Sequence, residues 1–139
     1  MRILVETPKY SFLKYHKVGS RFNIEFFSPI PVLFNYGFVE NSLSEDGMEK
    51  DVIIVGPRME QGTVLERSHF DGIVRFTDDS LRDDKHIVYI DGPFPVTLFS
   101  LYFRLYAMFK FFLYLLFEKK LARCRFEGID FPVSARGFE

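Results

Sequence analysis

The stretch HIVYIDGPFPVTLFSLYFRLYAMFKFFLYLLFEKKL, residues 86–121, decides the fold class of this chain. Its first five residues form a β-branched and aromatic run, which predicts a strand, and Asp91-Gly92-Pro93 predicts a turn. Residues 97–121 contain no Gly or Pro and are long enough for about six helical turns. The sequence therefore predicts a strand that is followed by one long helix.

Short apolar runs before this stretch extend the strand pattern towards the N-terminus. They cover residues 2–5, 21–27, 52–55, 63–67 and 72–76, and turn residues such as Gly56-Pro57 and Gln61-Gly62 separate them. Short strands of this kind close into a small antiparallel sheet or barrel. We therefore predict an α+β fold in a single domain, residues 1–139, with a β-rich part at 1–92 and a helix with an irregular tail at 93–139.

The composition is that of an ordinary globular chain and excludes several classes of function. The 139 residues are 47% hydrophobic and 27% charged, and the net charge of -1 gives no excess of cations for binding DNA. A single cysteine, Cys124, cannot form an intramolecular disulfide, and the N-terminus shows no secretory signal. We therefore expect an intracellular protein, in the cytoplasm or an organelle matrix, that is not secreted.

The predicted helix is apolar on nearly every side. Leu98 to Phe117 has the length of a membrane span, but Arg104 and Lys110 lie near its middle, where charges are costly. We therefore favour a core helix over a transmembrane one. Because a small sheet covers only one side of such a helix, and the chain contains 18 Phe and 7 Tyr, we predict that Leu98 to Phe117 contacts a second copy of the chain or another subunit.

Acidic residues gather in two segments beside predicted strands. Asp46 and Asp51 lie in the first, and Asp78 and Asp83 lie in the second, just before Lys85. Carboxylates that converge from two loops supply the oxygen ligands that Mg²⁺ prefers, and a nearby lysine can bind phosphate. Acidic turns are also common as simple solvated loops. The absence of Walker, Gly-x-Gly-x-x-Gly, Gly-x-Ser-x-Gly and His-Glu-x-x-His motifs removes the functions that those motifs predict.

Several short patterns, taken in their order along the chain, resemble the soluble family I inorganic pyrophosphatases. Asp46-Gly-Met-Glu-Lys-Asp51-Val resembles the family signature Asp-Gly-Asp-Pro-x-Asp-Val, and Asn35-Tyr-Gly-Phe38 resembles its Tyr-Gly turn. The further matching segments are Val5-Glu6 with Lys14-Tyr15, Gln61-Gly62-Thr63-Val64, Thr77-Asp78, Asp83-Asp84-Lys85, Phe103-Arg-Leu-Tyr106 and Phe126-Glu127-Gly128. Each pattern is short, and their common order carries the resemblance.

The resemblance implies a small OB-like, five-stranded antiparallel β-barrel with a long C-terminal helix packed on it. It also implies hydrolysis of diphosphate to two phosphates with Mg²⁺ as the cofactor. The implied metal-binding positions are Glu6, Asp46, Asp51, Asp78 and Asp83, and the implied phosphate-binding positions are Lys14, Tyr36, Lys85 and Tyr106. Within the first set, Asp46, Asp51 and Asp83 would hold the two ions that flank the attacking water.

The chain departs from the family pattern at the general base. Met48 stands where the family has the Asp that takes a proton from the water, and a thioether cannot accept that proton. Glu49 is the nearest substitute, although its side chain points the other way in an extended segment. Further positions differ as well: the family's phosphate-binding Arg falls at Ile24 or Glu25, His16 replaces a Glu, and Ala107 replaces a Lys.

These departures leave hypotheses from different classes open. We expect a Mg²⁺-dependent inorganic pyrophosphatase of reduced activity, because losing a general base typically lowers the rate by about a hundredfold to ten-thousandfold. The alternative is a catalytically inactive, pyrophosphatase-like subunit of a larger protein or organellar assembly. A third hypothesis keeps the scaffold for a different phosphate ester or nucleotide, accepted through Met48 and His16.

Overall fold

The computed structural model describes residues 1–28, 31–42, 49–90 and 96–130. The elements in these ranges are β1 (Arg2–Thr7), β2 (Leu13–Val18), β3 (Arg21–Phe27), β4 (Asn35–Val39), β5 (Asp51–Val55), β6 (Val64–Glu66), β7 (Gly72–Asp78), β8 (Leu81–Arg82), β9 (Lys85–Tyr89), α1 (Val96–Phe117) and β10 (Arg125–Asp130). Strands therefore dominate the part before α1, and a strand also follows it.

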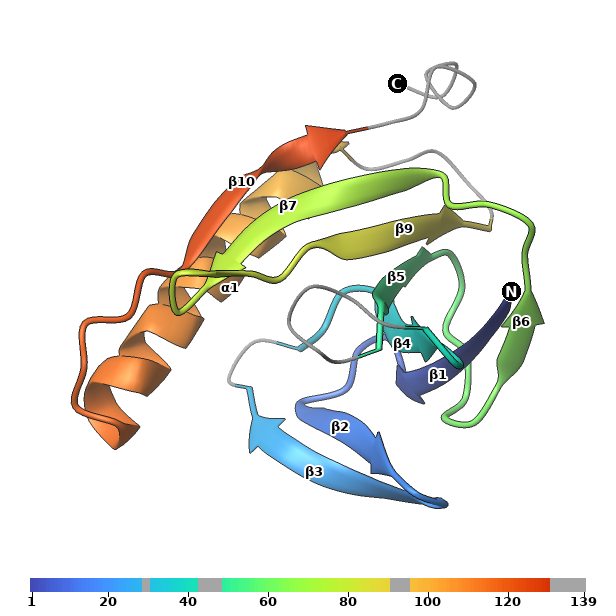
Figure 1. Ribbon diagram of the computed structural model, residues 1–139, viewed down its shortest axis with the longest axis horizontal. Helices are drawn as coiled ribbons and strands as arrows, with labels where there is room; N and C mark the ends of the chain where they lie inside the picture. Colours follow the sequence, from blue (N-terminus) through green and yellow to red (C-terminus); the bar gives the residue numbers. More distant parts are fainter. Residues whose placement is uncertain (29–30, 43–48, 91–95, 131–139) are drawn as a thin grey trace.

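The strands form one mixed sheet and one separate hairpin (Figure 1). The strand order in the sheet is β10-β7-β9-β5-β4-β1-β6, and β8 pairs with β7. Neighbouring strands are antiparallel except β5 and β9, which run parallel with Val52 opposite His86. The hairpin consists of β2 and β3 and lies below β1 in the view of Figure 1.

The central strand β5 shows why the sheet is buried on both faces. Successive side chains of a strand point to opposite faces, and Val52, Ile53 and Ile54 are all fully buried. Ile53 belongs to a core that also contains Phe76 of β7 and Phe103 of α1. Val52 and Ile54 belong to a second core, which residues of β1, β4 and β9 complete. A continuous apolar run is the pattern expected for a strand that is covered on both sides.

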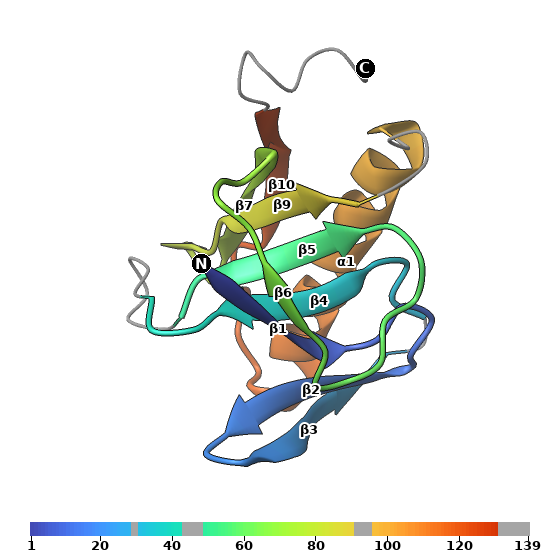
Figure 2. The same ribbon diagram turned by 90° about the vertical axis from the view of Figure 1, so that its right-hand side faces the viewer.

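Helix α1 covers one face of the sheet (Figure 2). Phe103 and Tyr106 pack against Phe76, with ring centroids 6.4 and 5.6 Å apart. The opposite side of the helix is exposed, at 53% for Leu101 and 49% for Phe112. Within the described residues, the segment Thr97–Phe117 is the one helix long and apolar enough to cross a membrane. The structure thus places one side of the helix in the core, as predicted, and leaves the other side uncovered.

The predicted α+β fold class, a small β-barrel-like sheet with a long C-terminal helix packed on it, is confirmed. The sheet differs from a closed, five-stranded antiparallel barrel in its details. It is eight-stranded in the described part of the chain, and it contains the parallel pair of β5 and β9. The helix ends at Phe117 instead of continuing to Leu121.

Two local predictions were wrong. The tail expected to be irregular contains β10, which pairs with β7 and packs Phe126 and Ile129 against the core under α1. The segment 35–38, interpreted as a turn, is most of strand β4. Gly37 is required there for a steric reason, because a Cβ atom at this position would lie 2.2 Å from the carbonyl oxygen of Leu4 on β1.

Candidate active site

A cavity of about 170 Å³ is lined by residues of the β2–β3 hairpin, the sheet and α1. All eight predicted metal-binding and phosphate-binding residues that the structure describes line it: Glu6, Lys14, Tyr36, Asp51, Asp78, Asp83, Lys85 and Tyr106. Their side chains come from seven different elements and the loop before β9. Two predicted positions, Asp46 and Met48, lie outside the described residues. Glu49 is exposed and is not among the lining residues.

Lys85 lines the cavity and forms ion pairs with two carboxylates. Its side chain is only 2% exposed, and its ammonium group donates to Asp83 Oδ2 at 3.1 Å and to Asp51 Oδ2 at 3.3 Å. Burial disfavours the charged form of Lys85 and by itself would lower its pKa. The two carboxylates outweigh this effect and raise the pKa of Lys85 well above the usual value. Both carboxylate oxygens therefore converge on a single cationic centre.

The two carboxylates differ in how readily they ionise. Burial and repulsion from Asp51 raise the pKa of Asp83, although Lys85 acts in the opposite direction. At Asp51, burial also favours the neutral form, but Lys85 and Lys14 stabilise the carboxylate and lower its pKa. Asp51 is the more open of the two, with 40% of its side chain exposed against 20% for Asp83. A ligand that enters the cavity therefore meets an ionised Asp51.

Lys14 enters the cavity from β2 among aromatic rings. Its ammonium group lies 3.1 Å from the Tyr106 hydroxyl and 5.3 Å from the centre of the Tyr36 ring. The Tyr36 hydroxyl is buried and makes no hydrogen bond of good geometry among the described residues, although it interacts with the neighbouring Tyr102 side chain. Burial also raises the pKa of Tyr36, so the hydroxyl stays protonated. A buried donor without a well-formed hydrogen bond is costly, and a ligand oxygen in the cavity would satisfy it.

Glu6 is positioned from β1 by contacts with β2. The backbone N–H of Lys17 donates to Glu6 Oε2 at 2.6 Å, and His16 Nδ1 lies 3.5 Å from the same oxygen. Burial is the main cause that raises the pKa of Glu6. Sequence reasoning gave His16 a role only in the hypothesis of a different phosphate ester or nucleotide, and the structure shows that it lines the cavity beside Glu6.

Asp78 has partners on α1 and on the segment after it. Its Oδ2 lies 3.2 Å from Lys110 Nζ, and its Oδ1 lies 3.8 Å from Cys124 Sγ. Sequence reasoning missed Lys110 as a site residue. A signal for it was available, because Lys110 follows Tyr106 by four positions and such residues share one side of a helix. Tyr15, Glu25 and Gly37 also line the cavity and were not predicted.

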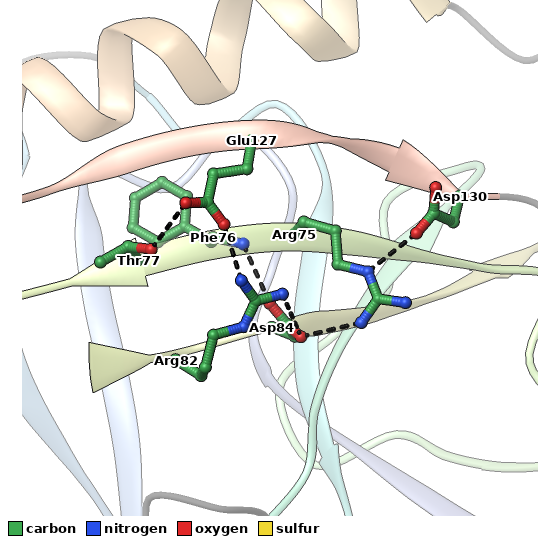
Figure 3. A network of polar contacts seen from close by, with 7 residues as sticks. All are labelled: Arg75, Phe76, Thr77, Arg82, Asp84, Glu127 and Asp130. Carbon is green, nitrogen blue, oxygen red and sulfur yellow. Dashed lines mark hydrogen bonds and ion pairs between the residues drawn. The ribbon is translucent and has the colours of Figure 1, made fainter. Parts of the chain in front are cut away.

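Asp84, the neighbour of Asp83, lies in a structural network instead of the cavity (Figure 3). Its Oδ1 accepts a hydrogen bond from the backbone N–H of Phe76 at 3.1 Å, and its Oδ2 accepts from Arg75 and Arg82. These bonds fix the short connection between β8 and β9 against β7. The network therefore sets the position from which Asp83 and Lys85 reach the cavity.

The cavity contains part of the donor set that a magnesium site requires. Carboxylate oxygens are suitable ligands, and Asp51 and Asp83 already converge on one cation, so these two residues fit Mg²⁺. Within the described ranges, no three His, Cys, Asp or Glu side chains are grouped closely enough to hold a metal ion by themselves. Asp78 fits less well, because the protein's own groups contact both of its oxygens.

Comparison with known proteins identifies the family. The family model described as inorganic pyrophosphatase matches residues 3–95. Over 97 residues the chain is 31% identical to an inorganic pyrophosphatase of Corynebacterium efficiens, a match that covers 67% of this chain and 61% of the relative. A match to an inorganic pyrophosphatase of Streptomyces coelicolor is 34% identical over 87 residues and covers 60% and 53% of the two chains. The chain thus spans about three fifths or less of the length of these relatives.

Solved structures show the same fold. The crystal structure of an inorganic pyrophosphatase from Neisseria gonorrhoeae superimposes with a TM-score of 0.74 and 22% identity, covering 94% of this chain and 82% of the other. The structure of an inorganic pyrophosphatase from Coxiella burnetii has a TM-score of 0.75 and 18% identity, covering 99% and 89%. From the match of its own sequence over residues 3–95, the chain belongs to the inorganic pyrophosphatase family.

Proposed function

We propose that this protein hydrolyses diphosphate to two phosphates in the cavity between the β2–β3 hairpin, the sheet and α1. The observation that supports this most directly is the convergence of eight predicted positions, distant in sequence, on one cavity of about 170 Å³. Family membership supports the same reaction.

The cavity has the groups that a small polyanion requires. Lys14 and Lys85 supply positive charge, and the hydroxyls of Tyr36 and Tyr106 supply hydrogen-bond donors. The Tyr36 hydroxyl makes no hydrogen bond of good geometry, so a ligand oxygen could serve as its acceptor. In our proposal these four groups bind diphosphate oxygens, and the low exposure of Lys85 keeps its charge strongly felt inside the cavity.

Asp51 and Asp83 are the described residues that would hold Mg²⁺, with Asp46 as a further ligand from the segment outside the described residues. When bound, Mg²⁺ supplies a Lewis acid that activates water and neutralises part of the negative charge of diphosphate. Asp51 serves this role best, because its lowered pKa keeps it ionised and its side chain is the more exposed. Glu6, held by Lys17 N–H and His16, would complete the acidic wall of the cavity.

We propose a reduced rate because no carboxylate stands at the family's base position. Met48 cannot take a proton, and Glu49, the predicted substitute, is exposed and does not line the cavity. The resulting loss is on the order of a hundredfold or more.

The test is phosphate release from magnesium diphosphate by the purified chain. Asp51→Ala should abolish Mg²⁺-dependent release while retaining the fold, because Lys85 keeps its ion pair with Asp83. Glu66→Ala, an exposed position on β6, is the matched control and should leave release unchanged. Equal phosphate release by wild type and Asp51→Ala would contradict the proposal. A wild-type protein that releases no phosphate at any Mg²⁺ concentration would contradict it as well.

The uncovered side of α1 favours a second candidate role, as a subunit of an assembly. The exposed or partly exposed apolar residues recur in the order Leu98, Leu101, Leu105, Met108, Phe112 and Leu115. Spacings that alternate between three and four residues are those of a helix–helix seam. We propose that a second copy of this chain covers the seam.

Light scattering after size-exclusion chromatography measures the oligomeric state directly. Wild type should elute as an oligomer, and Leu105→Glu should shift it to the monomer, whereas the exposed Leu81→Glu on β8 should not. A wild-type monomer would rule out the second copy.

A further inference from the structure

Asp78 is bound on both of its carboxylate oxygens by groups of the protein. Oδ2 lies 3.2 Å from the ammonium group of Lys110, and Oδ1 lies 3.8 Å from Cys124 Sγ. The Asp78 and Lys110 side chains are only 18% and 13% exposed. A metal ion could reach Asp78 only by removing a cation from a poorly solvated place, where an unpaired charge is unfavourable.

Aromatic rings hold Lys110 in this place. Its ammonium group lies 5.5 Å from the ring centre of Phe26 on β3 and 5.5 Å from that of Tyr114, one turn further along α1. Both distances are within the range of cation–π attraction. The rings thus favour the lysine cation beside Asp78, and the Tyr114 hydroxyl also interacts with the Asp78 carboxylate.

The contrast with Lys85 shows where a metal ion can bind. Lys85 lies within ion-pair distance of both Asp51 and Asp83, so the two carboxylates share it, and Lys14 acts on them from farther away. Asp51 is also 40% exposed. The pair of Asp78 and Lys110 is one to one, and little of it is exposed. Attraction for a divalent cation therefore persists at Asp51 and Asp83 and is cancelled at Asp78.

We propose that the ammonium group of Lys110 takes the place of a metal ion at Asp78, so that the protein binds diphosphate with a fixed cation at this carboxylate. The inference rests on the proposed function, since it assigns one of the positive charges that meet the substrate. Lys110 lines the cavity on the same side of α1 as Tyr106.

The experiment measures the number of Mn²⁺ ions bound per chain. The electron paramagnetic resonance signal gives the concentration of free Mn²⁺, and the bound amount follows by difference. The measurement is made with and without methylenediphosphonate, a diphosphate analogue that cannot be hydrolysed. Wild type should bind at least one Mn²⁺ through Asp51 and Asp83, and Asp78→Asn should bind the same number. Lys110→Met, which frees Asp78, should bind one Mn²⁺ more than wild type. Lys120→Met, which removes an exposed lysine paired with Asp79, is the control and should match wild type.

Loss of one Mn²⁺ in Asp78→Asn would overturn the proposal, because it would make Asp78 a metal ligand in the native protein. The proposal would also be overturned if a folded Lys110→Met variant bound the same number of Mn²⁺ ions as wild type, or if wild type bound no Mn²⁺. If Lys110→Met does not fold, the count for Asp78→Asn decides alone. Because the count requires no turnover, a failure of hydrolysis would refute the proposed function without changing this result.

Discussion

The variant Lys85→Met removes the cation between Asp51 and Asp83 while keeping an apolar side chain of similar length. Breaking a buried ion pair by deleting one partner costs about 3–5 kcal/mol. The Asp51 and Asp83 side chains remain 40% and 20% exposed, so water screens part of their repulsion and we expect a loss of about 2 kcal/mol. For a chain of 139 residues this corresponds to a fall in Tm of roughly 7 °C.

Urea unfolding in EDTA and in Mg²⁺ measures this effect and tests the metal assignment together. In EDTA the variant should lose the full amount, and Mg²⁺ should restore most of it, because the ion binds between the same two carboxylates. Lys120→Met removes an exposed lysine and should change little under either condition. Unchanged stability in EDTA, or a loss that Mg²⁺ does not reduce, would refute the reasoning.

The same variant has a pH dependence of known sign. The pKa of Asp51 is lowered from 3.8 in the folded wild type, so its interaction with Lys85 adds stability above that value and loses it as the pH falls through the folded pKa. Lys85→Met lacks this contribution. The difference in unfolding free energy between wild type and variant in EDTA should therefore shrink on acidification from pH 6 towards pH 3, and a constant difference would contradict the assignment.

Three further predictions follow from single positions. Tyr36→Phe should change the free energy of unfolding little, because the hydroxyl makes no well-formed hydrogen bond, and should raise the KM for diphosphate by about three- to tenfold. A clear loss of stability would show a partner for this hydroxyl in the free protein. Gly37→Ala should destabilise by several kcal/mol, on the order of the severest core changes, since its Cβ would lie 2.2 Å from Leu4 O, and denaturant unfolding checks this. Met48→Asp should raise kcat for diphosphate by about a hundredfold or more if the missing base limits the rate, and an unchanged kcat would place the base elsewhere.

Much of the architecture was predictable because it depends on local patterns. The apolar run at 52–55 and the helix between Pro95 and the tail carry their signals within a few residues. β10 was missed because its residues alternate weakly and its Gly128 interrupts the pattern, so its pairing with β7 decides its conformation. β4 was missed because Asn35 and Gly37 are typical of turns, whereas the close approach of β1 requires the glycine within a strand.

The candidate site also combines features that the sequence predicted with features that only the tertiary structure shows. By itself, the sequence determined the α+β class, the family and the eight described positions that line the cavity, because strand and helix propensities and the order of short motifs are properties of the chain. Only the tertiary structure decided which charges neutralise each other: Lys85 with Asp51 and Asp83, and Lys110 with Asp78. The reason is that electrostatic pairing depends on distance and burial, and packing of α1 and the hairpin against the sheet sets both for residues far apart in sequence.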